Sequence, residues 1–331
     1  DVHYKIKAKI DEKTNILSGQ EELIYYNNSP DTLNFVFFHL YQNAFQPDSY
    51  FDKMTRKNGV TPRYGKYEAQ KKNTEIIQMI SNGIELKKEE DNTILKVYLT
   101  KPLLPNDSVT FDITFNSYFD SGTQRRRMKM FSVFGNKHFD GVHWYPRIAV
   151  YDRKFGWETD QHMEKEFYGD FGTYDAELDF ANHYIVEATG DLLNRTEVLP
   201  DDLRKQLDIS NFKDKPMFSA PSIIIPYDST IRKTWKYHAV NVHDFAFTAD
   251  PTYRIGESEW NGIKCIALAQ EPNAARWQNA AEYTAKIIKT YSEDFGMYVY
   301  PKMIVADARD GMEYPMLTLD GGYDPAYRDL L

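Results

Sequence analysis

The chain has 331 residues, of which 42% are apolar and 15% aromatic, and it carries a formal net charge of −9. This length exceeds what one hydrophobic core usually serves, so we expect about two domains, and the composition excludes an intrinsically disordered chain. The basic runs are short and the apolar runs fall well below about 18 residues, which argues against nucleic acid as a partner and against a membrane span within this chain.

The first predicted element starts almost at residue 1. Residues 4–10 alternate apolar side chains with lysines, in the period of a half-buried strand. Because a strand follows residue 1 so directly, we expect that a leader has been removed and that the protein is periplasmic or extracellular. A cytoplasmic location stays open.

The same alternation recurs along the first two thirds of the chain. It predicts strands at residues 23–26, 33–40, 94–99, 109–115 and 176–180. Turn sequences such as Asn28-Ser29-Pro30-Asp31 separate these segments. Residues 1–243 are therefore predicted to form a mainly β, predominantly antiparallel domain.

The pattern changes in residues 244–331. Strands are predicted at 245–247, 263–269, 302–306 and 316–319, and Cys265 is expected to be a buried small apolar residue. Residues 277–295 form the one strongly helical segment that the sequence predicts. Its apolar stripe consists of Trp277, Ala281, Thr284, Ile288, Tyr291 and Phe295. We interpret this region as the start of an α+β domain, unfinished in size.

Most of the common catalytic motifs are missing from the sequence. The chain has eight histidines, but none forms the His-Glu-x-x-His spacing of a zinc helix. A nucleophile elbow and a phosphate-binding glycine loop are also missing from the sequence. We therefore predict no metal ligand and no catalytic residue within this chain.

One short segment remains of interest, namely Gly311, Met312, Glu313 and Tyr314. A glycine that permits close backbone approach precedes a carboxylate flanked by apolar strand. Glu313 is either an ordinary carboxylate of an edge strand or a ligand-binding group, and the residues alone favour the first.

Several motifs in the same order resemble the zinc aminopeptidases related to membrane alanyl aminopeptidase and leukotriene-A4 hydrolase. The segment from Gly311 to Pro315 resembles their exopeptidase signature Gly-x-Met-Glu-Asn. Residues 296–301 resemble their Gly-x-Tyr-x-Tyr-Pro turn, and Trp144-Tyr145-Pro146-Arg147 resembles a landmark of their first domain. The resemblance extends over nearly the whole chain.

Two departures from the family pattern stand out. Tyr314 replaces the asparagine of the signature, and Asp310 stands where glycine or alanine is common, so the first substrate subsite is expected to differ. The family's His-Glu-x-x-His helix follows the signature by about 20 residues, whereas this sequence ends 16 residues after Pro315. The resemblance thus places the zinc ligands and the general base beyond Leu331.

The resemblance also implies a fold and a function. The fold is a saddle-shaped β-domain followed by the opening α+β part of a thermolysin-like catalytic domain. The full-length protein would be a zinc-dependent aminopeptidase that removes residues from peptide N-termini and binds Zn²⁺, whereas this chain alone would be inactive. Its partners would be peptides with a free N-terminus and the rest of the catalytic domain.

The resemblance assigns substrate contacts to particular residues. Glu313 would bind the substrate α-ammonium group, and the backbone of Gly311 and Met312 would align the peptide like an added strand. Asp140 and His143 are further candidates, with lower weight, for a polar group that the β-domain adds to the ammonium pocket.

Two alternatives to an enzyme stay open. The protein could be a non-catalytic binding or scaffold protein that retains the β-domain. A carbohydrate-binding β-sandwich would explain the aromatic content, but it explains neither the helix at 277–295 nor the Gly-Met-Glu segment.

Overall fold

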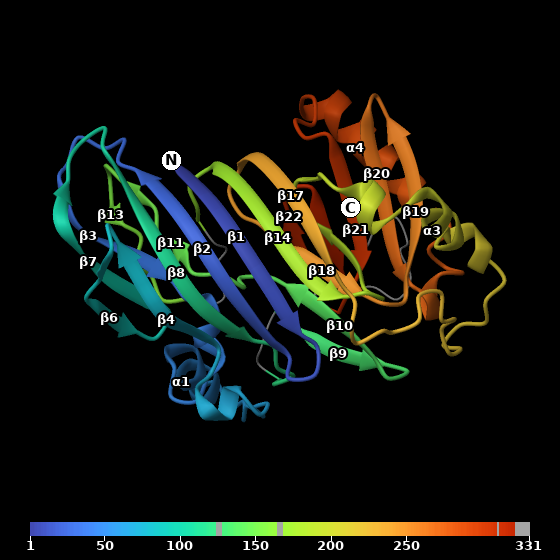
Figure 1. Ribbon diagram of the computed structural model, residues 1–331, viewed down its shortest axis with the longest axis horizontal. Helices are drawn as coiled ribbons and strands as arrows, with labels where there is room; N and C mark the ends of the chain where they lie inside the picture. The colour runs from blue at the N-terminus through green and yellow to red at the C-terminus, as the bar shows by residue number, and fades with distance from the viewer. Residues whose placement is uncertain (124–127, 164–167, 310, 322–331) are drawn as a thin grey trace. The chain divides into compact units, whose positions relative to one another are not determined.

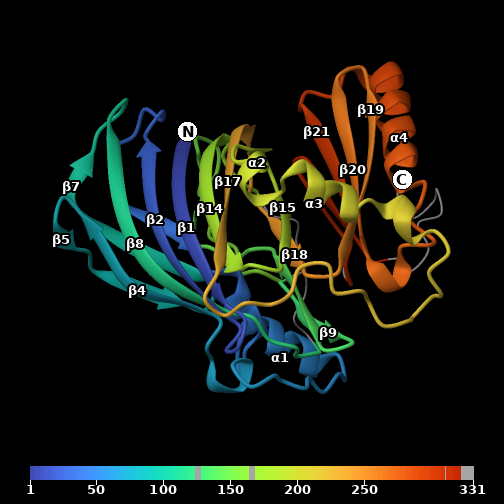
Figure 2. The same ribbon diagram turned by 45° about the vertical axis from the view of Figure 1, so that its right-hand side comes forward.

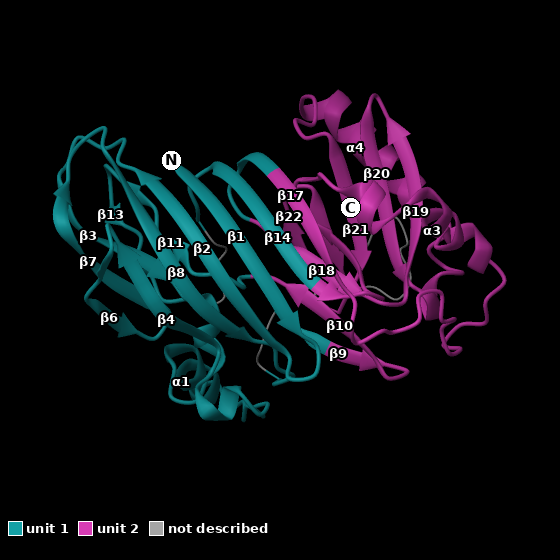
Figure 3. Ribbon diagram, in the orientation of Figure 1, with its two compact units in different colours: residues 1–130, 143–179, 239–244 teal, residues 131–142, 180–238, 245–331 magenta. Residues whose placement is uncertain are grey.

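The computed structural model describes residues 1–123, 128–163, 168–309 and 311–321, and it is mostly β (Figure 1). The chain divides into two compact units, coloured separately in Figure 3. Unit 1 contains residues 1–130, 143–179 and 239–244, and unit 2 contains residues 131–142, 180–238 and 245–331. This division follows contacts rather than chain order, so the predicted domain boundary between residues 243 and 244 stays a prediction.

The main sheet of unit 1 has the strand order β14-β1-β2-β8-β4-β5. Its neighbours are antiparallel except β1 and β14, which are parallel. The apolar residues of the predicted first strand all face the core, as their alternation requires. The strands are β1 (Val2–Asp11), β2 (Ile16–Tyr26), β4 (Thr74–Ser81), β5 (Ile84–Glu85), β8 (Ser108–Tyr118) and β14 (Gly172–Ala181).

A second sheet of unit 1 has the order β11-β3-β7-β6 and packs on the first. The Phe38 ring meets Phe111 edge-on at 5.4 Å between centroids, and the Ile148 N–H donates to the Tyr4 hydroxyl at 3.0 Å. These strands are β3 (Leu33–His39), β6 (Lys88–Asp91), β7 (Ile94–Leu103) and β11 (Arg147–Ile148). A small hairpin pairs β12 (Tyr151–Asp152) with β13 (Gly156–Trp157).

Helix α1 (Tyr50–Lys57) belongs to unit 1 and was not predicted from the sequence. Ser49 caps it, because its hydroxyl accepts the Asp52 N–H at 2.9 Å. The helix has eight residues and buries Phe51 and Thr55. Its short length explains why no periodic stripe marked it.

Unit 2 contains a four-stranded sheet in the order β15-β18-β10-β9. Its strands are β9 (Met130–Val133), β10 (Asn136–Gly141), β15 (Ile185–Ala188) and β18 (Phe247–Asp250). Strand β16 (Asp191–Leu192) pairs with β17 (Arg232–Val242), and two short helices follow β16. These helices are α2 (Arg195–Val198) and α3 (Asp201–Gln206).

The second sheet of unit 2 has five strands in the order β19-β20-β21-β23-β22. Strands β20, β21 and β23 run parallel, and the two outer strands run antiparallel to their neighbours. Helix α4 (Ala280–Phe295) covers one face of this sheet (Figure 2). The strands are β19 (Tyr253–Trp260), β20 (Ile263–Gln270), β21 (Lys302–Asp307), β22 (Met312–Tyr314) and β23 (Leu317–Asp320).

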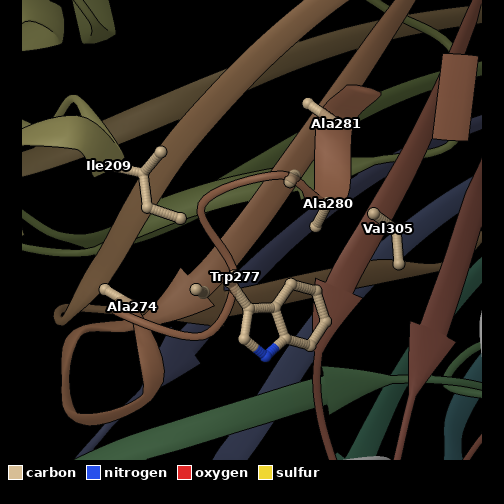
Figure 4. Packing of buried hydrophobic residues seen from close by; sticks show 8 residues of the cluster. Ile209, Ala274, Trp277, Ala280, Ala281 and Val305 are labelled. Atoms are coloured by element: carbon tan, nitrogen blue, oxygen red, sulfur yellow. The ribbon is translucent and has the colours of Figure 1, made fainter. Parts of the chain in front are cut away.

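The predicted helix is present but begins later than expected. Its first turn starts at Ala280, because the 277–279 segment forms the turn that leads into it. Trp277 nevertheless lies fully buried in the core cluster beneath the helix, beside Ala274 and Val305 (Figure 4). At the other end of the stripe Tyr291 and Phe295 are 43% and 84% exposed, so only the first four of its six residues belong to the core.

None of the helices in the described part of the chain is long and apolar enough to cross a membrane.

Candidate functional site

The segment singled out by sequence lies on an edge strand of unit 2. Strand β22 closes the five-stranded sheet and pairs with β23 alone among the described residues. Met312 and Tyr314 are buried, whereas Glu313 between them is exposed. The strand period thus holds the two apolar side chains in the core and turns the carboxylate of Glu313 outward.

A tight turn joins β22 to β23. It contains Pro315 followed by Met316, whose φ of 65° lies in the left-handed region that favours glycine. Proline at the first central position and a positive φ at the second are typical of a type II turn. A methionine in that conformation costs on the order of 1 kcal/mol, which the burial of Met316 offsets.

Gly311 precedes the edge strand without filling a tight space. A Cβ there would meet only the Leu319 carbonyl oxygen, at 3.8 Å. Packing therefore does not explain the glycine at 311. Residue 310, the predicted departure from the family signature, lies outside the described residues.

A buried charged cluster lies elsewhere in unit 2. His138 on β10 is fully buried, and its two ring nitrogens contact Asp140 Oδ1 at 2.8 Å and Asp250 Oδ2 at 3.0 Å. Burial lowers the pKa of His138, but the charges of Asp140 and then Asp250 outweigh it and raise the pKa to about 10. His138 is therefore an imidazolium held between two carboxylates. We call His138, Asp140 and Asp250 the imidazolium cluster.

Hydroxyl groups extend this cluster. Thr248 donates to Asp140 Oδ1 at 3.0 Å and lies 2.7 Å from the Tyr253 hydroxyl. The Tyr253 hydroxyl in turn donates to the Asp307 carbonyl oxygen at 3.2 Å. The network thus runs from β10 and β18 to the end of β21, four residues before Gly311.

Asp307 itself is an unusual carboxyl group. Its Oδ2 accepts the Gln270 N–H at 3.1 Å and the Asn273 amide at 2.9 Å, and it is 2% exposed. Burial raises the pKa of Asp307 to about 7, although these hydrogen bonds and the His138 charge pull it down. Asp307 therefore changes charge near neutral pH.

Stacked rings connect the imidazolium cluster to the approach of the edge strand. Phe131 stacks on His138 with 4.4 Å between centroids, and the Arg309 guanidinium lies 4.4 Å from the Phe131 centroid. Arg309 comes two residues before Gly311. The segment that leads into β22 is thus anchored to the cluster at Arg309 and, through Tyr253, at Asp307.

The two further candidates, Asp140 and His143, belong to different compact units. Asp140 is 1% exposed and belongs to the imidazolium cluster of unit 2. His143 belongs to unit 1, where it is 3% exposed and lies 4.6 Å from the Tyr41 ring centroid and 5.4 Å from that of His162. The structure thus groups Asp140 with residues that sequence reasoning missed.

Those missed residues are His138, Thr248, Asp250, Tyr253 and Asp307. The sequence contained one usable signal, because His138 and Asp140 are two apart on a strand and therefore share a face. Their partners lie 108 and 112 residues further along the chain. No local pattern joins them.

The described residues offer no set of ligands for a metal ion. Among the described residues, no three His, Cys, Asp or Glu side chains are placed to hold a metal ion. The carboxylates of the imidazolium cluster are already bonded to His138. A zinc site therefore does not fit the described part of the chain.

Comparison with solved structures gives a clear likeness of fold. The M1 zinc metallopeptidase of Deinococcus radiodurans, in a variant form, matches with a TM-score of 0.58 and 13% identity, over 99% of this chain and 61% of its own. A variant bound to a Tyr-Ser-Ala substrate matches with a TM-score of 0.57 and 13% identity, over 99% and 62%. A two-domain M1 zinc metallopeptidase bound to L-tryptophan gives 0.57 and 12%, over 99% and 62%.

The fold of this chain is therefore that of the matched part of M1 zinc metallopeptidases. The chain spans about three fifths of the length of these proteins. No family model matches the sequence, and no curated protein matches it either.

Proposed function

We propose that this chain is the substrate-recognising part of a zinc-dependent aminopeptidase, with Glu313 as the group that binds the substrate α-ammonium. The observation that carries the proposal is the geometry of β22, an edge strand whose only acidic side chain points outward between two buried neighbours. The fold shared with M1 zinc metallopeptidases supports it. In this proposal the β-domain has the family's saddle shape, and β19 to β23 open a thermolysin-like domain.

The chemistry of recognition follows from charge and strand geometry. An exposed carboxylate can accept charge-assisted hydrogen bonds from an ammonium group, which fixes where the peptide N-terminus lies. The open edge of β22 offers backbone N–H and C=O groups to an extended peptide, as in strand addition. Gly311 and Met312 would contribute these groups, and Tyr314 would shape the first subsite.

The imidazolium cluster supports the same proposal through its charge. Two carboxylates surround one imidazolium, so the cluster has one surplus negative charge before Asp307 is counted. The Arg309 guanidinium over Phe131 offsets this surplus in part, and the negative potential that remains would favour a cationic ligand. Asp140 would attract the substrate ammonium group through this potential, and His138 would hold the Asp140 side chain in place. His143 keeps its lower weight, since its described neighbours are aromatic rings and histidines of unit 1.

Zinc is proposed as the cofactor of the full-length protein only. When bound, the metal would polarise the scissile carbonyl and activate water. Its ligands and the general base are assigned to sequence outside this chain, so this chain alone should not hydrolyse peptides. Peptides with a free N-terminus and the rest of the catalytic domain are the proposed partners, and a periplasmic or extracellular location is the proposed setting.

The decisive experiment replaces Glu313 by glutamine in the full-length protein. Losing the charge-assisted contact should lower kcat/KM for an amino-acid amide ten- to a hundredfold, corresponding to about 1.5 to 3 kcal/mol. Glu282→Gln, at an exposed position on α4, is the matched control and should leave kcat/KM unchanged.

Two results would contradict this proposal. An unchanged kcat/KM in Glu313→Gln would remove the role given to that residue. A full-length protein without about one equivalent of zinc, and without chelator-sensitive hydrolysis, would favour the binding or scaffold protein instead.

A further inference from the structure

A cleft of about 680 Å³ opens in unit 2 away from β22. One wall is the face of β19, β20 and β21 opposite α4. Cys265 and Ile263 pack toward α4, so the alternating neighbours Lys264 and Ile266 must point to the other face. Residues around β16 and α2 line the cleft as well.

The floor of this cleft contains a buried ammonium group. Lys302 is 5% exposed, and its Nζ lies 3.3 Å from Glu187 Oε2 and 5.3 Å from the Tyr237 ring centroid. An ammonium group has three N–H donors, and Glu187 is the only hydrogen-bond acceptor that Lys302 reaches among the described residues. A buried donor without an acceptor costs about 1 to 3 kcal/mol, so the remaining N–H donors of Lys302 need water or a ligand in the cleft as acceptor.

A second lysine lies beside the first. Lys264 and Lys302 are register partners on the parallel strands β20 and β21, and both line the cleft. Among the described residues Lys264 forms no ion pair. Arg195, which also lines the cleft, already forms an ion pair with Glu257 at 3.1 Å, so the two lysines are the better partners for a ligand. A carboxylate has two oxygens and can accept from both lysines at once.

Negative groups complete the lining. Asp191 and Glu259 line the cleft and form no ion pair within the described ranges, and Glu259 is the register partner of Lys264 on β19. Apolar side chains lie between these charges, namely Leu192, Leu199, Ile255 and Ile266. The cleft therefore offers a cationic end, an acidic group and an apolar surface.

We propose that this cleft binds a dipeptide-sized zwitterion, with its carboxylate at Lys302 and Lys264 and its ammonium at Asp191 and Glu259. The apolar residues would hold its side chains. Sites of about 300 to 1,000 Å³ take small ligands, so the volume suits a dipeptide. The site shares no residue with β22, and the inference does not depend on the proposed peptidase activity.

The test is calorimetric titration of the 331-residue protein with three probes. Leucyl-leucine should bind, whereas its N-acetyl form lacks the ammonium and its amide form lacks the carboxylate, and both should bind at least tenfold more weakly. Equal binding of the amide would overturn the lysine clamp. Equal binding of the acetylated form would overturn the acidic half.

Variants locate the site. Lys264→Gln at the exposed lysine should weaken leucyl-leucine at least tenfold. The exposed control Lys289→Gln on α4 should not change the affinity. Lys302→Met should abolish binding of leucyl-leucine, provided that circular dichroism shows the variant to be folded. If Lys302→Met does not fold, the affinity of Lys264→Gln decides whether the lysines bind the carboxylate.

Glu313→Gln separates this site from the one on β22. Unchanged affinity in that variant supports the cleft, even if the proposed aminopeptidase activity proves wrong. Loss of binding in Glu313→Gln, or full binding in Lys264→Gln, would place the dipeptide elsewhere and overturn the inference.

Discussion

Unit 1 and unit 2 each bury a cation against carboxylates, one carboxylate in unit 1 and two in unit 2, so the two arrangements differ in charge balance. In unit 1 the Arg147 Nη1 donates to Asp244 Oδ2 at 2.9 Å, and the Tyr145 hydroxyl donates to the other oxygen at 2.6 Å. Both charged residues are at most 2% exposed. This pair is neutral. In unit 2 one imidazolium faces two carboxylates, so that cluster carries a surplus negative charge.

The difference indicates what each arrangement can do. A neutral buried pair with its hydrogen bonds satisfied holds strands together, and removing one partner leaves an uncompensated buried charge. A cluster with surplus negative charge instead favours protons or cations nearby. The pKa of Asp307, raised to about 7 chiefly by burial, agrees with a region where negative charge is costly. We therefore expect mutation of the charged groups to lower the stability of both units. In unit 2 we expect the stability to depend on pH as well.

Breaking the neutral pair should have the largest effect. Asp244→Asn keeps the shape but leaves the Arg147 guanidinium buried without a carboxylate, so we expect a loss of about 3 to 5 kcal/mol in the free energy of unfolding. Urea denaturation at pH 7 measures it. Asp202→Asn, whose side chain is 94% exposed, is the control and should change stability by less than about 0.5 kcal/mol. A loss below 1 kcal/mol for Asp244→Asn would mean that water reaches the pair.

Removing the cation of unit 2 should lower the free energy of unfolding by about 3 kcal/mol, and the size of this loss should depend on pH. His138→Gln leaves Asp140 and Asp250 without their shared partner. Because the pKa of His138 is raised from 6.5 to about 10 in the folded protein, its stabilisation is fully present below pH 6.5 and is lost as the pH rises to about 10. Wild type and variant are compared at pH 6, 8 and 9.5. A difference that stays constant over this range would contradict the imidazolium.

Asp307 should make the wild type less stable as the pH rises. Its folded pKa of about 7 exceeds the ordinary value of 3.8, so the contribution is present below pH 3.8 and is lost as the pH rises through 7. Relative to Asp307→Asn, the wild type should lose about 2 to 3 kcal/mol between pH 5 and pH 8, at 1.36 kcal/mol per unit. Parallel stability curves for the two proteins would show that Asp307 is ionised throughout.

The smallest effect is expected for the matched change in unit 2. Asp250→Asn removes one carboxylate but leaves His138 paired with Asp140 at 2.8 Å, so the remaining pair is neutral. We expect the free energy of unfolding to fall by about 1 kcal/mol, well below the loss expected for Asp244→Asn. Equal losses in the two asparagine variants would mean that charge balance does not distinguish the units.

Much of the fold could be predicted from the sequence where the side-chain period was clear. Strands β1, β2, β3, β7, β8, β14, β20, β21 and β23 all occur where alternation or an apolar run predicted them. Strand β19 was missed because Arg254, Glu257 and Glu259 interrupt its apolar pattern. Arg254 is nonetheless fully buried, since Glu271 on a distant segment pairs with it. Pairing with β20 forms a strand at residues 253–260 that the local sequence pattern does not predict.

For the candidate site the sequence determined one feature by itself. Glu313 lies between two apolar residues of a strand, so the period of two turns it outward wherever that strand packs. Only the tertiary structure decided the charge clusters, the cleft at Lys302 and the edge position of β22. Ionic pairing needs atoms within about 4 Å, and residues such as His138 and Asp250 are 112 positions apart along the chain. Folding alone brings them that close.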